Sequence, residues 1–209
     1  MVTYPAYEML YQLVKPSWKV FEYGCGNSSL WWSTHASEVV SVEHNINWAN
    51  HVRAQRRANL QVLDKPRGVI YAPLPAEIAL AFRFLTDRQV VHESAAVNEE
   101  HGLNCPDFVG YVATLMDWPR GYFDAIVIDG MARSLAAYLA GLWVKPTGIV
   151  VFDNSDRWQY GQAWRHCGGW ALPGFDAAER AALELRSLTI LSASRSWTTL
   201  SELPPWANS

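Results

Sequence analysis

Apolar positions along the chain follow two spacings, one typical of amphipathic helices and one typical of buried strands. Short, nearly continuous apolar runs are predicted to be strands, and the segments between them, with helical spacing, are predicted to be helices. The predicted strands are 19–24, 39–45, one near 68–72, 122–130 and 149–154. The predicted helices are 4–14, 28–36, 47–59, 106–118 and 133–144.

Strands that are apolar throughout and that alternate with helices indicate a parallel sheet buried on both faces. We therefore predict a doubly wound, mostly parallel α/β fold with three layers, αβα. The runs 187–193 and 196–203 are β-like and a short turn joins them, so a β-hairpin is expected to close the sheet. Residues 73–105 mix a helical patch with a loop-like stretch and are interpreted as an insertion or lid. In such sheets ligands bind outside the carboxyl ends of the strands, where the strand order reverses.

Length and composition fit a single domain over residues 1–209, since half of the residues are hydrophobic and can form a sizeable core. With 17 basic and 20 acidic residues the net charge is −3, which argues against a nucleic-acid partner. Three cysteines without CxxC spacing favour a reducing compartment. We find no signal peptide and no apolar run long enough to span a membrane. A cytoplasmic protein without a membrane partner is expected, and the oligomeric state is left open.

The first predicted strand runs into a turn that contains two glycines, EYGCGNS at 22–28, before the next helix. Glycines let the backbone approach a ligand closely, and the amides at the helix start point toward it. Glu43 ends the second strand, where a carboxylate can accept hydrogen bonds from both ribose hydroxyls of an adenosine. Together these features predict an adenosyl ligand. The residues expected to contact it are Glu22, Tyr23, Gly24, Gly26, Asn27, Ser28, Glu43 and His44.

Two positions in this turn distinguish between adenosyl ligands. A dinucleotide needs a third glycine for close packing of the helix, and Ser29 stands at that position. Glu22 would repel a pyrophosphate, but it can hydrogen-bond, directly or through water, to the ammonium group of a methionine moiety. S-adenosylmethionine is therefore favoured over NAD. An NAD(P)-dependent oxidoreductase and a non-catalytic adenosyl-binding protein on the same fold remain as alternatives.

These motifs resemble those of class I S-adenosylmethionine-dependent methyltransferases. The segments similar to that family are EYGCGNS (22–28), VEH (42–44), FDAIVIDG (123–130) and LWVKPTGIVVFDN (142–154). The likeness covers about 19–60 and 107–155, and it does not cover 73–105. It implies a seven-stranded sheet with an antiparallel C-terminal strand, and an S-adenosylmethionine whose sulfonium lies near Asp129.

Oxygen-bearing side chains follow the fourth and fifth predicted strands, Asp129 after one and Asp153 and Asn154 after the other. Such ligands suit a hard divalent cation such as Mg²⁺. This is similar to metal-dependent small-molecule O-methyltransferases of the catechol and caffeoyl-CoA type, and it implies a metal that holds the acceptor hydroxyls. The sequence departs from that pattern at Arg133, which stands where a further aspartate is expected. Asp153 and Asn154 also fit a structural role in the turn after the strand.

The expected catalytic residues, Asp129, Asp153 and Arg133, would place an acceptor opposite the methyl group. Arg133 and Arg157 are expected beside the same edge, where arginine can bind a carboxylate or phosphate with two hydrogen bonds, although both also fit a solvated surface. With the tryptophans of the C-terminal region, these arginines favour a small polar or glycan-type acceptor. The sequence does not identify that acceptor.

Overall fold

The structure, a computed structural model, describes residues 10–66, 68, 76, 108–153 and 189–192. Within these residues one six-stranded sheet has the order β3-β2-β1-β4-β5-β6, and every neighbouring pair is parallel. Its strands are β1 (Lys19–Tyr23), β2 (Glu38–Glu43), β3 (Leu60–Asp64), β4 (Phe123–Ile128), β5 (Val144–Phe152) and β6 (Thr189–Ser192). The helices are α2 (Asn27–His35), α3 (Ile46–Arg53), α6 (Val109–Ala113), the 3-10 helix η2 (Thr114–Asp117) and α7 (Arg133–Trp143).

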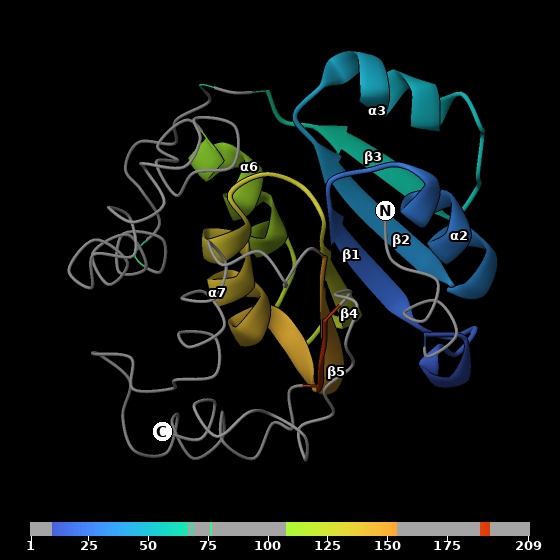
Figure 1. The fold of residues 1–209 in the computed structure, drawn as a ribbon, viewed down its shortest axis with the longest axis vertical. Helices are drawn as coiled ribbons and strands as arrows, with labels where there is room; N and C mark the ends of the chain where they lie inside the picture. The colour runs from blue at the N-terminus through green and yellow to red at the C-terminus, as the bar shows by residue number, and fades with distance from the viewer. Residues whose placement is uncertain (1–9, 67, 69–75, 77–107, 154–188, 193–209) are drawn as a thin grey trace.

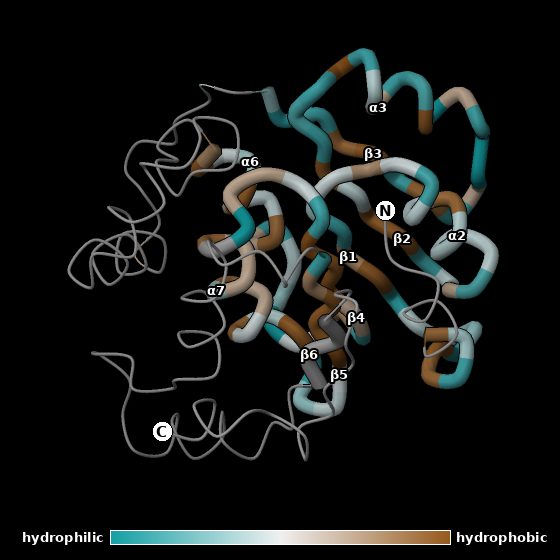
Figure 2. Tube along the Cα trace, viewed as in Figure 1, coloured by the Kyte–Doolittle hydropathy of each residue, from teal (hydrophilic) through white to brown (hydrophobic). Residues whose placement is uncertain are grey.

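Alternate residues of the central strands face opposite layers of helices, and this produces the three-layer fold (Figure 1). In β1, Val20 packs in one hydrophobic cluster together with Trp32 of α2. Phe21 and Tyr23 point to the other face and share a cluster with Leu139 of α7. The strands form the hydrophobic centre of the tube in Figure 2, whereas α3 at the outside has many hydrophilic positions. The predicted αβα layering is confirmed.

The strand order reverses between β1 and β4, which are neighbours in the sheet although they are distant in sequence. The helix that follows β1, α2, lies on one face, and the helix that follows β4, α7, lies on the other. The connections therefore leave the sheet in opposite directions at this point. In open α/β sheets this topological switch point is where ligands bind.

Most predicted elements are observed within a few residues of their expected bounds, but the third strand is not. It was expected near 68–72, and β3 is instead Leu60–Asp64, at the edge of the sheet beside β2. Only Val62 of its five residues is buried, because a strand at the edge of the sheet is only partly covered, and this pattern is less conspicuous than the apolar run that follows it. Residues 69–72 lie outside the described part of the chain.

The C-terminal half of the sheet contains one irregularity and one short strand. β5 begins earlier than the expected 149–154, because Val144 already pairs with Phe123 of β4. The register between the two strands shifts between the pair of Phe123 with Val144 and the pair of Ala125 with Ile149. β6 lies within the predicted strand 187–193 and is parallel to β5. The second half of the predicted hairpin, 196–203, and the insertion 73–105 (except Ala76) lie outside the described residues, so a seventh, antiparallel strand stays a prediction.

The described part of the chain includes no helix that combines the length and the apolar character needed to cross a membrane.

Candidate functional site

The glycine bend (residues 22–28) lies between the ends of β1 and β4, at the switch point. Gly24 has a φ of 91°, a conformation that residues with a Cβ rarely adopt. A Cβ at Gly24 would lie 3.1 Å from backbone atoms of Asp129 and Gly130, so the bend packs directly against the connection that follows β4. The amide of Asp129 donates a hydrogen bond of 3.0 Å to the carbonyl of Tyr23. Gly24 is therefore needed for close packing against the end of β4, and the predicted approach of this backbone to a ligand stays a prediction.

Glu22, the first residue of this bend, is fully buried. One of its carboxylate oxygens accepts hydrogen bonds from the hydroxyls of Ser29 and, at 2.8 Å, Ser41. The Ser29 hydroxyl also accepts a 3.0 Å hydrogen bond from the amide of Gly26. Burial raises the pKa of Glu22 from 4.5 to about 7, although the neighbouring serine hydroxyls act in the opposite direction. Glu22 thus joins β1, β2 and the start of α2, and its contact with a methionine moiety stays a prediction.

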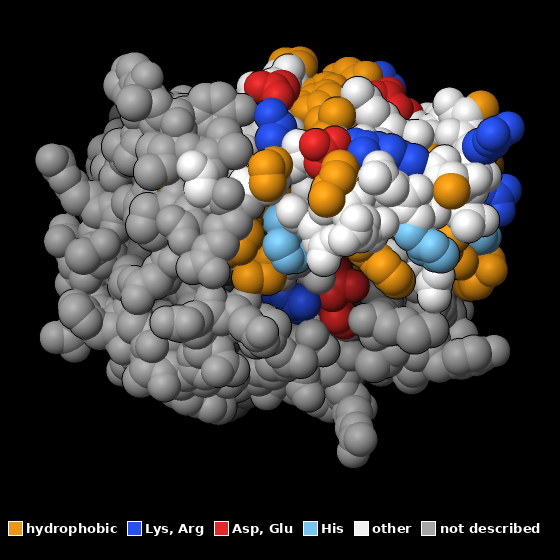
Figure 3. Space-filling view, turned by 90° about the horizontal axis from the view of Figure 1, so that it is seen from above, with side chains coloured by type: hydrophobic (Ala, Val, Ile, Leu, Met, Phe, Trp, Pro, Cys, Tyr) orange, Lys and Arg blue, Asp and Glu red, His pale blue; other side chains and the backbone are white. Residues whose placement is uncertain are grey.

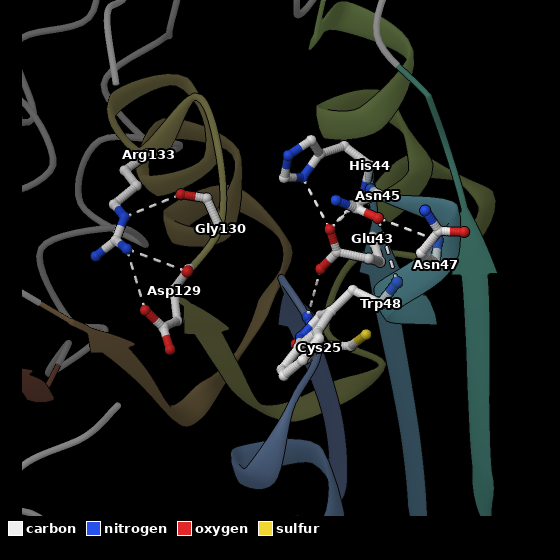
Figure 4. A network of polar contacts seen from close by, with 9 residues as sticks. All are labelled: Cys25, Glu43, His44, Asn45, Asn47, Trp48, Asp129, Gly130 and Arg133. Atoms are coloured by element: carbon white, nitrogen blue, oxygen red, sulfur yellow. Dashed lines mark hydrogen bonds and ion pairs between the residues drawn. The ribbon is translucent and has the colours of Figure 1, made fainter. Parts of the chain in front are cut away.

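Glu43, at the end of β2, contacts the glycine bend directly (Figure 4). One carboxylate oxygen accepts a 3.0 Å hydrogen bond from the amide of Cys25, and the other accepts from the amides of His44 and Asn45 at 3.0 and 2.9 Å. The Nδ1 of His44 lies 2.9 Å from the second oxygen. Burial by itself would raise the pKa of Glu43, but the hydrogen bonds from these groups outweigh burial and lower it. Glu43 is therefore an ionised carboxylate held against the bend.

The other residues predicted to contact a cofactor differ in where they lie. The side chain of Tyr23 points away from the bend into the core, where its hydroxyl donates to the carbonyl of Val112 at 2.8 Å. Asn27 is the first residue of α2, and Ser28 next to it is buried. His44 packs against Phe108 beside α6, with ring centroids 5.8 Å apart. Tyr23 can therefore take part in a ligand site only through its backbone.

Trp48 is a residue of this site that the sequence pattern did not single out. Its indole N–H donates to the carbonyl of Cys25 inside the bend, and a Cβ at Gly26 would lie 3.5 Å from the same nitrogen. The ring stacks on His51 at a centroid distance of 5.3 Å, yet Trp48 is 47% exposed. Asn45 caps α3 by accepting from two backbone amides, one of them that of Trp48. The available signal in the sequence was Asn45, a typical N-cap residue two positions after Glu43, which indicates that a helix carrying Trp48 begins next to the end of β2.

Asp129, Asp153 and Arg133, the three predicted catalytic residues, lie together at the ends of β4 and β5. The guanidinium of Arg133 donates to a carboxylate oxygen of Asp129 at 3.0 Å and to the backbone carbonyl of Asp153 at 2.6 Å. It also donates to the carbonyl of Gly130 at 2.9 Å (Figure 4). Burial and the neighbouring Asp153 raise the pKa of Asp129 to about 6, although Arg133 acts to lower it.

Arg133 is therefore placed differently from the expectation. It is 7% exposed and lies inside the protein, where it donates hydrogen bonds to residues at the strand ends, so it is not a solvated arginine at the mouth of a pocket. In the view from above, basic and acidic side chains lie next to each other among uncharged ones (Figure 3). The role expected for Arg133 as a group that binds an anionic acceptor is not supported by these contacts.

The predicted Mg²⁺ ligands do not fit a metal in this arrangement. Asp129 and Asp153 are adjacent, but the guanidinium of Arg133 lies beside them, 3.0 Å from the Asp129 carboxylate and 3.9 Å from that of Asp153. Among the described residues no cluster of three or more His, Cys, Asp or Glu side chains is arranged to hold a metal ion. The third predicted ligand, Asn154, lies outside the described residues, as does Arg157.

Neither models of known protein families nor curated proteins give a match to this chain. Its function is therefore inferred from the residues of the site.

Proposed function

We propose that this protein binds S-adenosylmethionine at the switch point between β1 and β4 and transfers its methyl group to a small polar or glycan-type acceptor. The observation behind this proposal is the contact between Glu43 and the glycine bend, at 3.0 Å from the Cys25 amide to the carboxylate. The glycine bend and Glu43 come from different parts of the chain and lie next to each other. A nucleoside that is bound by both would require this arrangement. A seventh, antiparallel strand at 196–203 belongs to the same proposal.

The groups around the bend fit an adenosyl ligand with a cationic end better than a dinucleotide. Glu22 and Glu43 place two carboxylates at the bend, and both would oppose a pyrophosphate. The third-glycine position is filled by Ser29, which is fully buried and bonded to the Glu22 carboxylate. Glu43 would hold the ribose, the bend would lie against the methionine part, and Asp129 would face the reacting end. When bound, S-adenosylmethionine supplies a methyl group on a sulfonium that is already a good leaving group.

The residues at the ends of β4 and β5 would contribute to transfer by position and by proton transfer. With a pKa of about 6, Asp129 changes its protonation close to neutral pH and is suited to accept a proton from an acceptor hydroxyl. Arg133 fixes the carboxylate of Asp129 and the backbone around it. Positioning supplies most of the acceleration in such a reaction.

Replacing Glu43 with glutamine is expected to weaken binding of S-adenosylhomocysteine at least about tenfold, or ~1.4 kcal/mol, because an amide loses one acceptor for ribose hydroxyls. Isothermal titration calorimetry measures this effect. Glu38→Gln is the matched control, because Glu38 lies at the amino-terminal end of the same strand, far along it from Glu43. There it contacts Tyr122 and Lys19. Circular dichroism checks that both variants are folded. Equal affinity in the two variants would remove Glu43 from the site.

The same titrations separate the three functions under consideration. Heat with S-adenosylhomocysteine and none with NADH supports the proposal, and the reverse result favours an oxidoreductase. Formation of S-adenosylhomocysteine from the methyl donor, with a panel of uronic acids, sugar phosphates and catechols, then tests for an enzyme. Donor binding without turnover on any acceptor would favour a non-catalytic adenosyl-binding protein.

A ligand in the bend is also expected to change the fluorescence of Trp48, because the indole bonds to the Cys25 carbonyl beside Glu43. The emission change on adding S-adenosylhomocysteine should be largely lost in Trp48→Phe. Trp31→Phe is the control, since Trp31 lies on α2 and packs against Tyr11 and His35. An equal change in the wild type and in Trp48→Phe would show that the ligand does not reach this side of the bend.

A further inference from the structure

We infer that Arg133 is an internal counter-ion that takes the place of a divalent cation next to the adjacent carboxylates of Asp129 and Asp153. The chain carries a latent cation site at this edge of the sheet, and the guanidinium keeps it closed. This inference goes beyond the proposed function and does not depend on it.

The two carboxylates are brought together by the parallel pairing of β4 and β5. Ile128 lies opposite Phe152 in that pairing, so the next residue of each strand, Asp129 and Asp153, leaves the sheet at the same edge. The amide of Asp153 donates to the carbonyl of Ile128 at 3.0 Å, which continues the pairing beyond the strand ends. Asp153 is 1% exposed, and 20% of the Asp129 side chain is exposed. Two negative charges in so little water need a cation close by.

Arg133 supplies that cation through oxygen contacts to both strand ends. It reaches a carboxylate oxygen of Asp129 at 3.0 Å and one of Asp153 at 3.9 Å. It also donates to the backbone carbonyls of Asp153 and Gly130, at 2.6 and 2.9 Å. Carboxylate and carbonyl oxygens from two strands are the set of ligands that a hard divalent cation takes. The guanidinium donates to the Asp129 carboxylate and to the two carbonyls with its planar set of donors, and it supplies positive charge near the Asp153 carboxylate.

The local backbone places Arg133 at this point. The residue before it, Ala132, has a φ of 52°, which is uncommon for a residue with a Cβ. This conformation lets the chain turn back after β4, so that α7 begins at Arg133 next to the carbonyls of residues 129 and 130. A divalent ion between the carboxylates would then lie a few ångströms from a guanidinium that stays charged in proteins, and the two cations would repel each other.

The test is a Mn²⁺ titration followed by electron paramagnetic resonance of the free ion, with the full chain and no methyl donor. The wild type is expected to show no Mn²⁺ site that depends on Asp153. Arg133→Ala is expected to gain one Mn²⁺ per chain with at least about tenfold higher affinity than the wild type, because the carboxylates lose their counter-ion. Asp153→Asn in the Arg133→Ala background should remove the gain, and Arg133→Lys should show none.

Arg53→Ala is the matched control, since Arg53 also pairs with a carboxylate, that of Asp64, but at the exposed edge of the sheet. It should gain no Mn²⁺. If Arg133→Ala is unfolded by circular dichroism without metal and folds when Mn²⁺ is added, the inference is supported. Mn²⁺ binding by the wild type that Asp153→Asn abolishes would overturn it. So would a folded Arg133→Ala variant that binds Mn²⁺ no better than Arg53→Ala.

Discussion

Replacing Gly130 with alanine is expected to destabilise the protein by about 3 kcal/mol or more, one of the largest effects of any single substitution in the described residues. A Cβ there would lie 1.9 Å from the hydroxyl oxygen of Tyr111, 2.8 Å from the amide nitrogen of Gly24 and 2.9 Å from the carbonyl carbon of Tyr23. Two of these atoms belong to the backbone of the glycine bend and cannot move aside alone. Urea unfolding followed by circular dichroism measures the loss.

Two further variants show whether this loss comes from the contact between the bend and the end of β4. Gly121→Ala is the control, because Gly121 has a φ of 75° but no described atom within 4 Å of its Cβ position. Gly121→Ala should lower the free energy of unfolding by only about 1 kcal/mol, which is the backbone strain. Tyr111→Phe combined with Gly130→Ala should recover part of the loss, since it removes the closest atom. If both substitutions lowered the free energy of unfolding equally, Gly130 would not pack closely against the backbone of the glycine bend.

Replacing Glu22 with glutamine is expected to stabilise the protein at alkaline pH and to change its stability little near pH 5. The pKa of Glu22 is 4.5 when exposed and about 7 in the folded chain, so between these values the folded state binds more protons than the unfolded state. Stability therefore falls as pH rises from about 4.5 to about 7, and the ionised carboxylate costs the folded state about 3 kcal/mol above that range.

Urea unfolding at several pH values tests this prediction, with the difference between Glu22→Gln and the wild type taken at each pH. That difference matters because Asp129, with a pKa of about 6, titrates in the same range in both proteins. Glu38→Gln serves as the control, since its carboxylate is about one-third exposed. If the stability of Glu22→Gln followed pH in the same way as the wild type, the buried carboxylate would not be the group that titrates.

The secondary structure of the described core could be predicted largely from hydrophobic spacing. β1, β2 and β4 are buried at nearly every position because both of their faces are covered, so valine, isoleucine and phenylalanine are frequent in them and mark them as strands. β3 was misplaced for the opposite reason. It lies at the edge of the sheet and is only partly buried, so its sequence gives a weaker signal than the neighbouring apolar run.

Most residues of the candidate site could be predicted from the sequence. The hydrogen bonds that connect these residues to one another could not. Glycines and an acid at strand ends indicated the bend and Glu43, since chain geometry and charge at these positions are local properties. Trp48 was missed because its bond to Cys25 joins residues that are 23 positions apart. The serines around Glu22 were missed as its partners for the same reason, since Ser41 lies on a different strand.

The sequence by itself determined that this chain forms a parallel α/β sheet with a glycine bend and acids at its carboxyl edge, because these features follow from local spacing and residue type. Only the tertiary structure decided how the charges at that edge are paired. Asp129, Asp153 and Asn154 were predicted to bind a metal with Arg133 nearby, whereas the fold places the guanidinium of Arg133 against the carboxylates of Asp129 and Asp153. Electrostatic pairing depends on distances between strand ends, and these are set when β4 and β5 pack side by side.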